Sequence, residues 1–189
     1  MDNENITHYA LNGNEMQYLN NDANIITYTE LNKIFDLDDL FKNTNKVIIL
    51  YLIKNSHYGH WTCLFKPINS KYDYYFYDSY GYYPDEEFDN ITYTKRIQLN
   101  EEQNRLRILL NMKNYDYNEF TMQGKNTSTC GMHTSHRLNN YHLNENEYIK
   151  FFLDNNIKNP DEYVSDWTDR KSTRLNSSHV ALSRMPSSA

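Results

Sequence analysis

The sequence is short of cysteine, glycine and proline: its 189 residues contain two, five and four of them, respectively. Two cysteines, Cys63 and Cys130, are too few for a framework of disulfides, which indicates a reducing compartment. Five scattered glycines leave no Gly-rich loop that would cradle a phosphate group. The composition therefore argues against a small secreted scaffold and against a P-loop nucleotide-binding protein.

Long hydrophobic runs are also missing. The longest apolar run, Val47–Ile53, is far shorter than the roughly 20 residues that a membrane-spanning helix needs. Residues 1–5 are acidic and polar, unlike the start of a secretory signal peptide. We therefore expect no membrane partner, no secretion and an intracellular location.

Positive charge is scarce as well, since 19 Lys and Arg residues face 25 Asp and Glu residues, for a net charge of −6. A protein that binds nucleic acid through its phosphates needs a basic face that displaces counterions. The sequence therefore predicts no strong basic surface for nucleic acid.

What is present suits a single folded domain. The hydrophobic share of 39% and the charged share of 23% differ from the balance of a disordered chain. We divide the sequence into a polar N-terminal segment (residues 1–24), one domain (residues 25–168) and a tail (residues 169–189). The tail, DRKSTRLNSSHVALSRMPSSA, is rich in Ser and has no Tyr or Phe. It resembles a translated sequencing adapter, so we interpret it as adapter read-through that is not native.

Hydrophobic periodicity predicts a small sheet. The continuous β-branched run Lys46–Ile53 is typical of a strand that is buried on both faces. Gly59–Lys66 and the aromatic run Tyr72–Asp78 are predicted as the next two strands, joined by a turn at Pro67–Lys71. Three further strands are predicted at Ile25–Tyr28, at Ile91–Gln98 as an edge strand, and at Tyr117–Met122.

Helical spacing and capping residues predict helices around this sheet. They are expected at Glu30–Ile34, Asp36–Lys42, Asn100–Met112, Cys130–Tyr141, Asn144–Leu153 and Asp161–Thr168. In the third of these, Asn100 is the predicted cap, and Leu106, Leu109 and Leu110 have helical spacing. Together the elements predict an α+β fold in which a small mixed or antiparallel sheet is flanked by helices.

The predicted hairpin brings a histidine close to a carboxylate. If Lys66 and Tyr72 flank the turn and face each other, His60 lies directly opposite Asp78 at the open end of the hairpin. A carboxylate within reach of an imidazole fixes its tautomer and stabilises its protonated form. The sequence thus predicts a His–Asp pair, which a register slip of one residue would separate.

Cys130 has the setting of a nucleophile. It follows three hydroxyl residues that are expected to cap a helix, and at a helix N-terminus the macrodipole favours a thiolate. The small Gly131 beside it leaves room for the backbone of a substrate. Gln123, seven residues before Cys130, can donate its amide hydrogens to a developing oxyanion. With His60 and Asp78, these residues supply a base, an orienting carboxylate, an oxyanion donor and a nucleophile.

Three strings of sequence carry a resemblance to a known family. Gly59-His60-Trp61, Tyr75–Gly81 and Gln123–Gly131 resemble the adenovirus-type (adenain-like) viral cysteine proteases and, more widely, the clan that includes the SUMO-specific proteases. The resemblance covers about residues 25–168. It implies a papain-like cysteine protease core of the adenain and SUMO-protease type, with the nucleophile at a helix N-terminus.

The resemblance also implies a role for each matching residue. Cys130 is expected to be the nucleophile and His60 the general base and then acid. Asp78 is expected to orient the imidazole, although the best-known adenovirus enzyme has Glu there, and Gln123 is expected to help form the oxyanion hole. Trp61 is expected to pack beside the site and, with Gly131, to contribute to substrate binding.

The implied function is that of a cysteine endopeptidase of a virus or virus-like element. It is expected to process virion precursor proteins after small residues, frequently Gly, as a monomer with a polypeptide substrate and no cofactor. Host cytoplasm, virus factory or virion are the expected locations. Two alternatives stay open: a hydrolase that removes ubiquitin-like or SUMO-like modifiers, and a non-catalytic relative that binds a Gly-ended tail or belongs to a capsid.

A zinc site is the alternative from another class of chemistry. His60, Cys63, Cys130 and His133 have the spacing of a Cys2His2 set. Residues three apart on a strand point to opposite faces, however, so His60 and Cys63 are not expected to share a metal ion. We therefore expect no metal site and expect His133 and His136 to be surface or packing residues.

Overall fold

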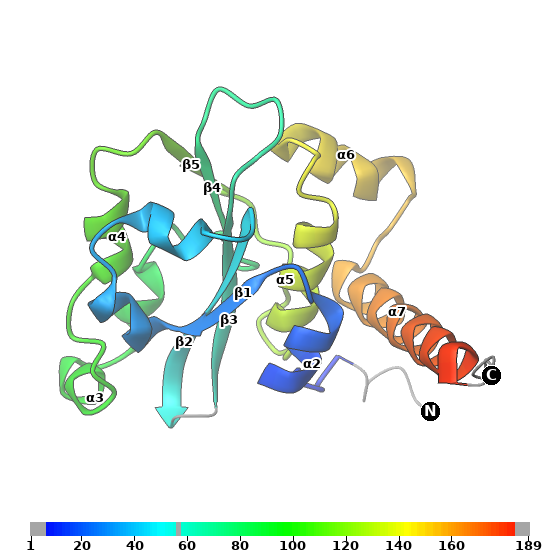
Figure 1. Ribbon diagram of the computed structural model, residues 1–189, viewed down its shortest axis with the longest axis horizontal. Helices are drawn as coiled ribbons and strands as arrows, with labels where there is room; N and C mark the ends of the chain where they lie inside the picture. Colours follow the sequence, from blue (N-terminus) through cyan, green and yellow to red (C-terminus); the bar gives the residue numbers. More distant parts are fainter. Residues whose placement is uncertain (1–6, 56–57, 184–189) are drawn as a thin grey trace, which may run out of the picture.

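Five strands form one mixed sheet in the order β1-β2-β3-β4-β5, so each strand pairs with its neighbours in the sequence (Figure 1). The computed structural model describes residues 7–55 and 58–183. The strands are β1 (Asn24–Thr27), β2 (Lys46–Asn55), β3 (Tyr58–Phe65), β4 (Tyr74–Tyr77) and β5 (Tyr115–Tyr117). The β1–β2 and β4–β5 pairs are parallel and the two pairs between them are antiparallel. The predicted α+β class with a small mixed sheet is confirmed.

β2 is the doubly buried strand that its sequence predicts. All residues from Val47 to Leu52 are buried. The even-numbered residues of this stretch join the hydrophobic core that contains α5 (Cys130–Asn139), and the odd-numbered residues join the core that contains α4 (Arg105–Leu110). Because both faces of β2 are covered, its sequence is continuously apolar rather than alternating.

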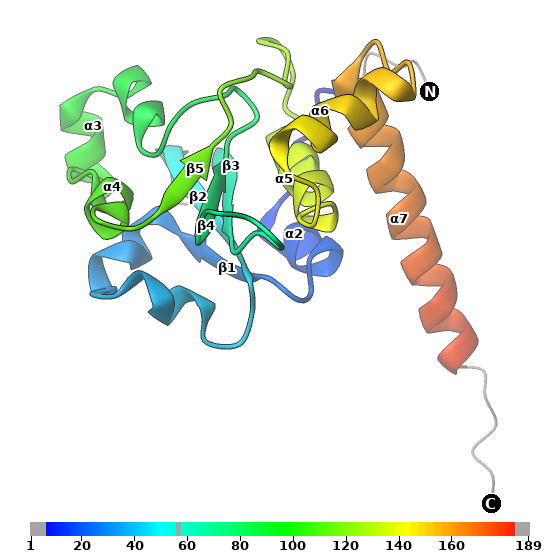
Figure 2. The same cartoon turned by 90° about the horizontal axis from the view of Figure 1, so that it is seen from above.

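Helices cover both faces of the sheet (Figures 1 and 2). On one side lie α2 (Gly13–Leu19), α5, α6 (Glu145–Asp154) and α7 (Pro160–Ser183). On the other side lie α3 (Tyr93–Gln98), α4 and three 3-10 helices, η1 (Tyr28–Lys33), η2 (Leu37–Phe41) and η3 (Glu86–Asn90). α5 is tied to β3 by a hydrogen bond of 3.0 Å from the Thr134 hydroxyl to the carbonyl of Trp61.

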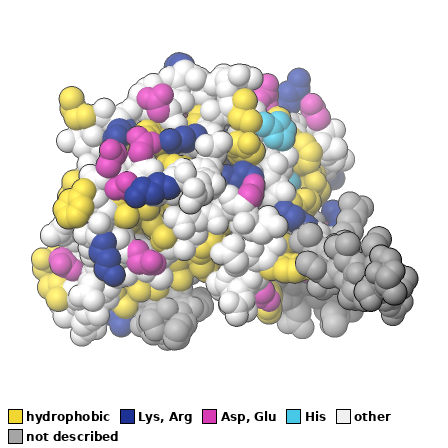
Figure 3. All heavy atoms as spheres, in the orientation of Figure 1, with side chains coloured by type: hydrophobic (Ala, Val, Ile, Leu, Met, Phe, Trp, Pro, Cys, Tyr) yellow, Lys and Arg dark blue, Asp and Glu magenta, His cyan; other side chains and the backbone are white. Residues whose placement is uncertain are grey.

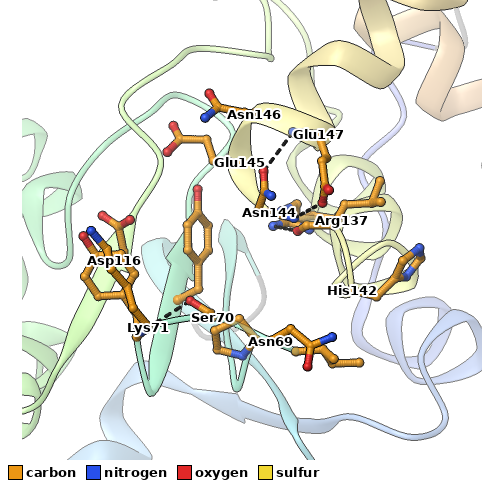
Figure 4. A pocket seen from close by; sticks show the side chains of 15 residues that line it. Asn69, Ser70, Lys71, Asp116, Arg137, His142, Asn144, Glu145, Asn146 and Glu147 are labelled. Atoms are coloured by element: carbon orange, nitrogen blue, oxygen red, sulfur yellow. Dashed lines mark hydrogen bonds between the residues drawn. The ribbon is translucent and has the colours of Figure 1, made fainter.

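Side-chain caps fix where two of these helices begin. At α2, the side chain of Asn12 accepts from the backbone N–H of Glu15, and the carboxylate of Glu15 accepts from the backbone N–H of Asn12. Asn144 and Glu147 form the same capping box at α6, as predicted for the start of that helix (Figure 4). α2 lies in the N-terminal stretch where the sequence predicted no element.

The predicted edge strand at Ile91–Gln98 is wrong, because residues Tyr93–Gln98 form α3. The alternation of Ile91, Tyr93 and Ile97 with polar residues imitates a strand. No residue of α3 is buried, however, and the segment satisfies its backbone groups within a helix and not in the sheet.

The helix predicted at Asn100–Met112 is shorter than expected and is reduced to α4. Asn100, the predicted cap, has a positive φ of 56° and belongs to the turn that follows α3. Met112 has a positive φ of 65° and lies beyond the helix. The leucines that the helical spacing selected, Leu106, Leu109 and Leu110, are all buried.

The strand predicted at Tyr117–Met122 is also wrong, because β5 covers only Tyr115–Tyr117. Asn118 then turns its side chain to the backbone of Asp78. Its Oδ1 accepts from the Asp78 N–H at 2.9 Å, and its Nδ2 donates to the Asp78 carbonyl at 2.6 Å. The side chain of Asn118 thus takes the place that the backbone of a continued β5 would have beside Asp78.

The β3–β4 hairpin has a different register from the predicted one. Cys63 pairs with Tyr77 and Phe65 with Tyr75, because the connection between the strands is longer than the turn expected at residues 67–71. The direct opposition of His60 and Asp78 is therefore wrong. The register differs by two residues, and a shift of two leaves both side chains on one face of the sheet.

The predicted domain boundaries fall inside elements of the fold. The boundary after residue 24 lies within β1, and Met16 and Leu19 of α2 join the core on the α5 side. The boundary after residue 168 lies within α7, where Lys171 donates to the carbonyl of Leu19 at 2.9 Å. The interpretation of residues 169–189 as read-through stays a prediction, and residues 1–6 and 184–189 lie outside the described residues.

The surface carries charges of both signs on the face seen in Figure 3, where Lys and Arg side chains lie among Asp and Glu side chains. Lys66 pairs with Asp38 at 2.7 Å and Lys113 with Asp36 at 3.3 Å. Among the described residues, none of the helices has the length and apolar character that crossing a membrane would require.

Candidate active site

The imidazole of His60 and the carboxylate of Asp78 meet at the end of the sheet where β3 begins and β4 ends. His60 Nε2 lies 2.9 Å from Asp78 Oδ2, and both side chains are buried. The regular pairing of the two strands ends at Cys63 and Tyr77, so the contact crosses the strands diagonally. The two residues that the sequence selected are therefore bonded, although their strands pair two residues away from the predicted register.

Further contacts fix the carboxylate and the imidazole in place. The second carboxylate oxygen of Asp78 accepts from the backbone N–H of Tyr80 at 2.7 Å. The ring of Tyr80 stacks on His60 with 5.1 Å between the centroids and 22° between the planes. Burial raises the pKa of Tyr80 to about 12, so this ring is neutral at physiological pH. The imidazole is thus held on one side by a carboxylate and on its face by an aromatic ring.

The environment favours the protonated form of His60. Burial alone lowers the pKa of an imidazole, but the charge of Asp78 and the hydrogen bond to it act in the opposite direction. The neighbouring Cys130 thiol raises the pKa further, and the pKa of His60 lies well above its usual value. A protonated imidazole beside a thiol stabilises the thiolate, which is the nucleophilic form of cysteine.

Cys130 is the first residue of α5, as predicted, and its side chain is almost wholly buried in the same cavity as His60. The first N–H groups of a helix have no partner within the helix and point toward its N-terminal end. The predicted capping by hydroxyls is wrong, because Thr129, the residue before the helix, makes no side-chain cap. The hydroxyls of Thr127 and Thr129 bond to Asp161 of α7 instead.

Cys63, the other cysteine, has a contrasting environment. It lies wholly inside the core on the α5 side. Burial raises the pKa of its thiol far above the usual value, which disfavours the thiolate. Cys63 is therefore a packing residue.

Gln123 lines the same cavity as Cys130 and His60. Its Oε1 accepts from the hydroxyl of Ser79 at 2.7 Å, and its Nε2 donates to the carbonyl of Thr127 at 2.9 Å. A side-chain amide carries two hydrogens, so one of them is left for another acceptor. The two bonds therefore fix the orientation of the amide and leave one of its hydrogens available.

Trp61 and Gly131 pack against each other and against the N-terminal segment. Trp61 Nε1 donates to the carbonyl of Leu11 at 3.0 Å. A Cβ atom at Gly131 would lie 3.1 Å from Trp61 Cδ1, 3.2 Å from Leu11 Cβ and 3.0 Å from Met16 Sδ. The glycine therefore allows Trp61, Leu11 and Met16 to pack closely against the start of α5. The predicted contribution of Gly131 to substrate binding stays a prediction. Trp61 still lines the cavity beside His60.

The cavity that these residues share has a volume of about 280 Å³. Its lining includes Ala10–Asn12, His60, Trp61, Tyr80, Glu87, Gln123 and Cys130. The sequence did not predict two parts of this wall. Glu87 sits in η3, whose sequence carries no catalytic signature, and burial raises the pKa of its carboxyl. Ala10–Asn12 arrive from the N-terminal segment, and only tertiary packing brings them to the site.

A separate cavity of about 430 Å³ lies between the β3–β4 connection and the start of α6 (Figure 4). Its walls carry both signs of charge, with Lys71 and Arg137 beside Asp116 and Glu145. The guanidinium of Arg137 donates to the carbonyls of Asn140 and Leu143 at 2.7 and 2.9 Å. Arg137 therefore holds the connection between α5 and α6, which is a structural role.

Three of the four residues of the zinc alternative are engaged elsewhere. His60 bonds to Asp78, Cys63 lies in the core, and His133 Nε2 lies 3.0 Å from Asp161 Oδ1. Within the part of the chain that the structure describes, no group of three His, Cys, Asp or Glu side chains could hold a metal ion. His133 and His136 are buried packing residues and not surface residues.

Comparison with known proteins places the chain beside a viral protein. No family model matches the sequence. The chain is 33% identical over 143 residues to "Uncharacterized protein V9" of Sputnik virophage, with 74% of this chain and 80% of that protein covered. At this identity and coverage, the chain belongs to the same family as protein V9 of Sputnik virophage.

Proposed function

We propose that the protein is a cysteine peptidase of the adenain-like type, in which Cys130 is the nucleophile. The observation that carries the proposal is the contact of 2.9 Å between His60 Nε2 and Asp78 Oδ2 in the cavity that also holds the Cys130 thiol. With Nε2 bonded to the carboxylate, the other ring nitrogen of His60 is left for the thiol. Nucleophile, base and orienting group then stand in the order that covalent catalysis requires.

The reaction is acyl transfer to water in two steps. The Cys130 thiolate attacks the scissile carbonyl, and the imidazolium of His60 gives its proton to the leaving amine as the C–N bond breaks. His60 then takes a proton from water, which attacks the thioester, releases the carboxylic acid and restores the thiolate. The oxyanion in each step accepts from the remaining amide hydrogen of Gln123 and from the backbone N–H of Cys130.

The relationship to a virophage protein supports a role in a viral life cycle. We propose that the substrates are virion precursor polypeptides, cut after small residues such as Gly, in an infected cell or in the virion. Trp61 and Ala10–Asn12 line one part of the cavity and leave limited space beside the thiol. A bulky side chain next to the scissile bond would have to displace these residues.

Alkylation by iodoacetamide tests the nucleophile and its base. At pH 6 we expect rapid labelling at Cys130 in the wild type and in Cys63→Ala, and none in Cys130→Ala. His60→Ala removes the imidazolium that stabilises the thiolate, so its labelling should be slower by about tenfold or more. The rate is measured by mass spectrometry of the intact protein.

Two outcomes would count against the proposal. Labelling of Cys130 that is unchanged in His60→Ala would mean that the two residues do not act as a pair. A wild-type protein that forms no acyl-enzyme with a panel of peptide esters ending in Gly-Gly would favour the non-catalytic alternative. Cleavage of ubiquitin-like or SUMO-like fusions, but of no linear Gly-Gly peptide, would favour the hydrolase of modifiers.

A further inference from the structure

One carboxylate outside the His60–Asp78 pair forms hydrogen bonds along the loop that leads to Cys130. Asp161, in the first turn of α7, is buried. Its Oδ2 accepts from the backbone N–H of Gly124 at 2.8 Å. Its Oδ1 accepts from the hydroxyl of Thr129 and from His133 Nε2, at 3.0 Å. The single hydrogen of the Thr127 hydroxyl is shared between this Oδ1, at 3.2 Å, and the carbonyl of Gly124, at 2.9 Å.

The four donors require a charged acceptor. A carboxylate accepts at both oxygens, whereas an amide in its place would turn an N–H group toward one of the donors. Burial raises the pKa of Asp161, but the hydrogen bonds from His133, Thr129 and Gly124 outweigh burial and hold the pKa below its usual range. The Nδ1 atom of His133 has no hydrogen-bond partner among the described residues, so the bond to Asp161 is the one that orients this buried imidazole.

The tethered loop carries the two groups that would bind an oxyanion. Gln123 immediately precedes Gly124, and its Nε2 is oriented by the carbonyl of Thr127 at 2.9 Å. Thr129 immediately precedes the backbone N–H of Cys130. The approach of the carboxylate is close enough that a Cβ atom at residue 124 would lie 3.0 Å from Asp161 Oδ2, which explains a glycine at that position.

We propose that Asp161 is a positioning residue, which acts through Gly124, Thr127 and Thr129 to hold the Gln123 amide and the Cys130 backbone N–H at the oxyanion. The inference rests on the proposed peptidase function. Asp161 touches neither the thiol nor the imidazole of His60, so its effect is confined to the step in which an oxyanion forms.

Asp161→Asn tests the inference with two reactions of one thiol. Hydrolysis of a fluorogenic Gly-Gly amide forms an oxyanion, and we expect kcat to fall about tenfold or more with KM nearly unchanged. Alkylation by iodoacetamide forms no oxyanion, so its rate and its pH profile should equal those of the wild type. Asp166→Asn, an exposed acid on the same helix, is the matched control and should leave both reactions unchanged.

A double-mutant cycle with Gln123→Ala shows whether Asp161 acts through the loop. If it does, Asp161→Asn added to Gln123→Ala lowers kcat much less than it does in the wild type. Thr127→Val, which removes one donor to Asp161, serves if Asp161→Asn does not fold, and a smaller loss of kcat with unchanged alkylation is expected.

The results separate this inference from the proposed function. Wild-type protein that hydrolyses no probe and shows no His60-dependent alkylation would overturn the peptidase itself. Active wild-type protein with an Asp161→Asn variant of equal kcat, or with alkylation lost in parallel with hydrolysis, would overturn only the positioning role.

Discussion

Asp78 combines two tasks that only a charged residue can perform at this place. Its Oδ2 holds His60 and its Oδ1 is held by the Tyr80 N–H, so the carboxylate fixes the ring and raises the pKa of the imidazole at the same time. Its backbone is held independently by Asn118. Asp78→Asn therefore changes the charge without removing the main support of this segment.

We expect Asp78→Asn to lower the pKa of His60, because the attraction that opposes burial is lost. The imidazolium then disappears at a lower pH and stabilises the thiolate less, so alkylation of Cys130 near pH 6 slows. The pH profile of iodoacetamide labelling measures the shift. Asp73→Asn, an exposed acid just before β4, is the control. An unchanged profile in Asp78→Asn would show that the carboxylate does not tune the pair.

At the scale of elements, the sequence predicts helices and strands whose bounds depend on local signals. It misses strand ends and registers that depend on side-chain contacts or on the length of connections. β2 and α6 were predicted close to their observed bounds, because a doubly buried apolar run and a capping box are local signals. The register of the β3–β4 hairpin was missed, since it depends on the length of an irregular connection. The His60–Asp78 contact was nevertheless predicted, because an error of two residues in the register leaves both side chains on the same face of the sheet.

The end of β5 was missed for a different reason, and it yields a prediction. Asn118 leaves the ladder to bond both backbone groups of Asp78. Asn118→Ala leaves the buried N–H of Asp78 unpaired, whereas the carbonyl of Asp78 still accepts from the N–H of Gly81 at 3.0 Å. We therefore expect a loss of about 1–3 kcal/mol in the free energy of unfolding. Because Asp78 is then less well placed, kcat for a Gly-Gly amide should fall as well. Urea denaturation and steady-state kinetics measure both effects, and a variant with normal kcat would show that β5 does not support the site.

At the scale of the whole molecule, α5 links the candidate site to the layer of helices beside it. Its first residue is Cys130, its fourth residue, His133, bonds to Asp161 of α7, and its seventh residue, His136, lies among aromatic rings of α6 and α7. The sequence predicted the helix to begin at Cys130, but it left open whether His133 and His136 lie on the surface or in the packing. Their burial depends on how α6 and α7 pack, and the local sequence of α5 does not encode that packing.

His136 makes the stability of this layer depend on pH. Burial, with the nearby charges of His133, Arg137 and Lys171, lowers its pKa to about 3 from a usual value of 6.5. Between these values the folded protein keeps His136 neutral, whereas the unfolded chain binds a proton at this residue. The contribution of neutral His136 to the free energy of unfolding is therefore fully present above about pH 6.5. It is lost as the pH falls, with a slope of up to about 1.4 kcal/mol per pH unit.

The variant His136→Gln isolates this contribution. Glutamine does not titrate, and its side chain can still bond to the hydroxyl of Tyr148, which His136 Nδ1 contacts at 2.9 Å. Other groups, including His60 with its raised pKa, titrate alike in both proteins and cancel in the difference. We expect the free energy of unfolding of the wild type to fall more steeply than that of the variant between pH 6.5 and 4.5, as measured by urea denaturation. Parallel curves would mean that His136 is already protonated in the folded protein, and the aromatic layer between α5, α6 and α7 would then have to accommodate a charge.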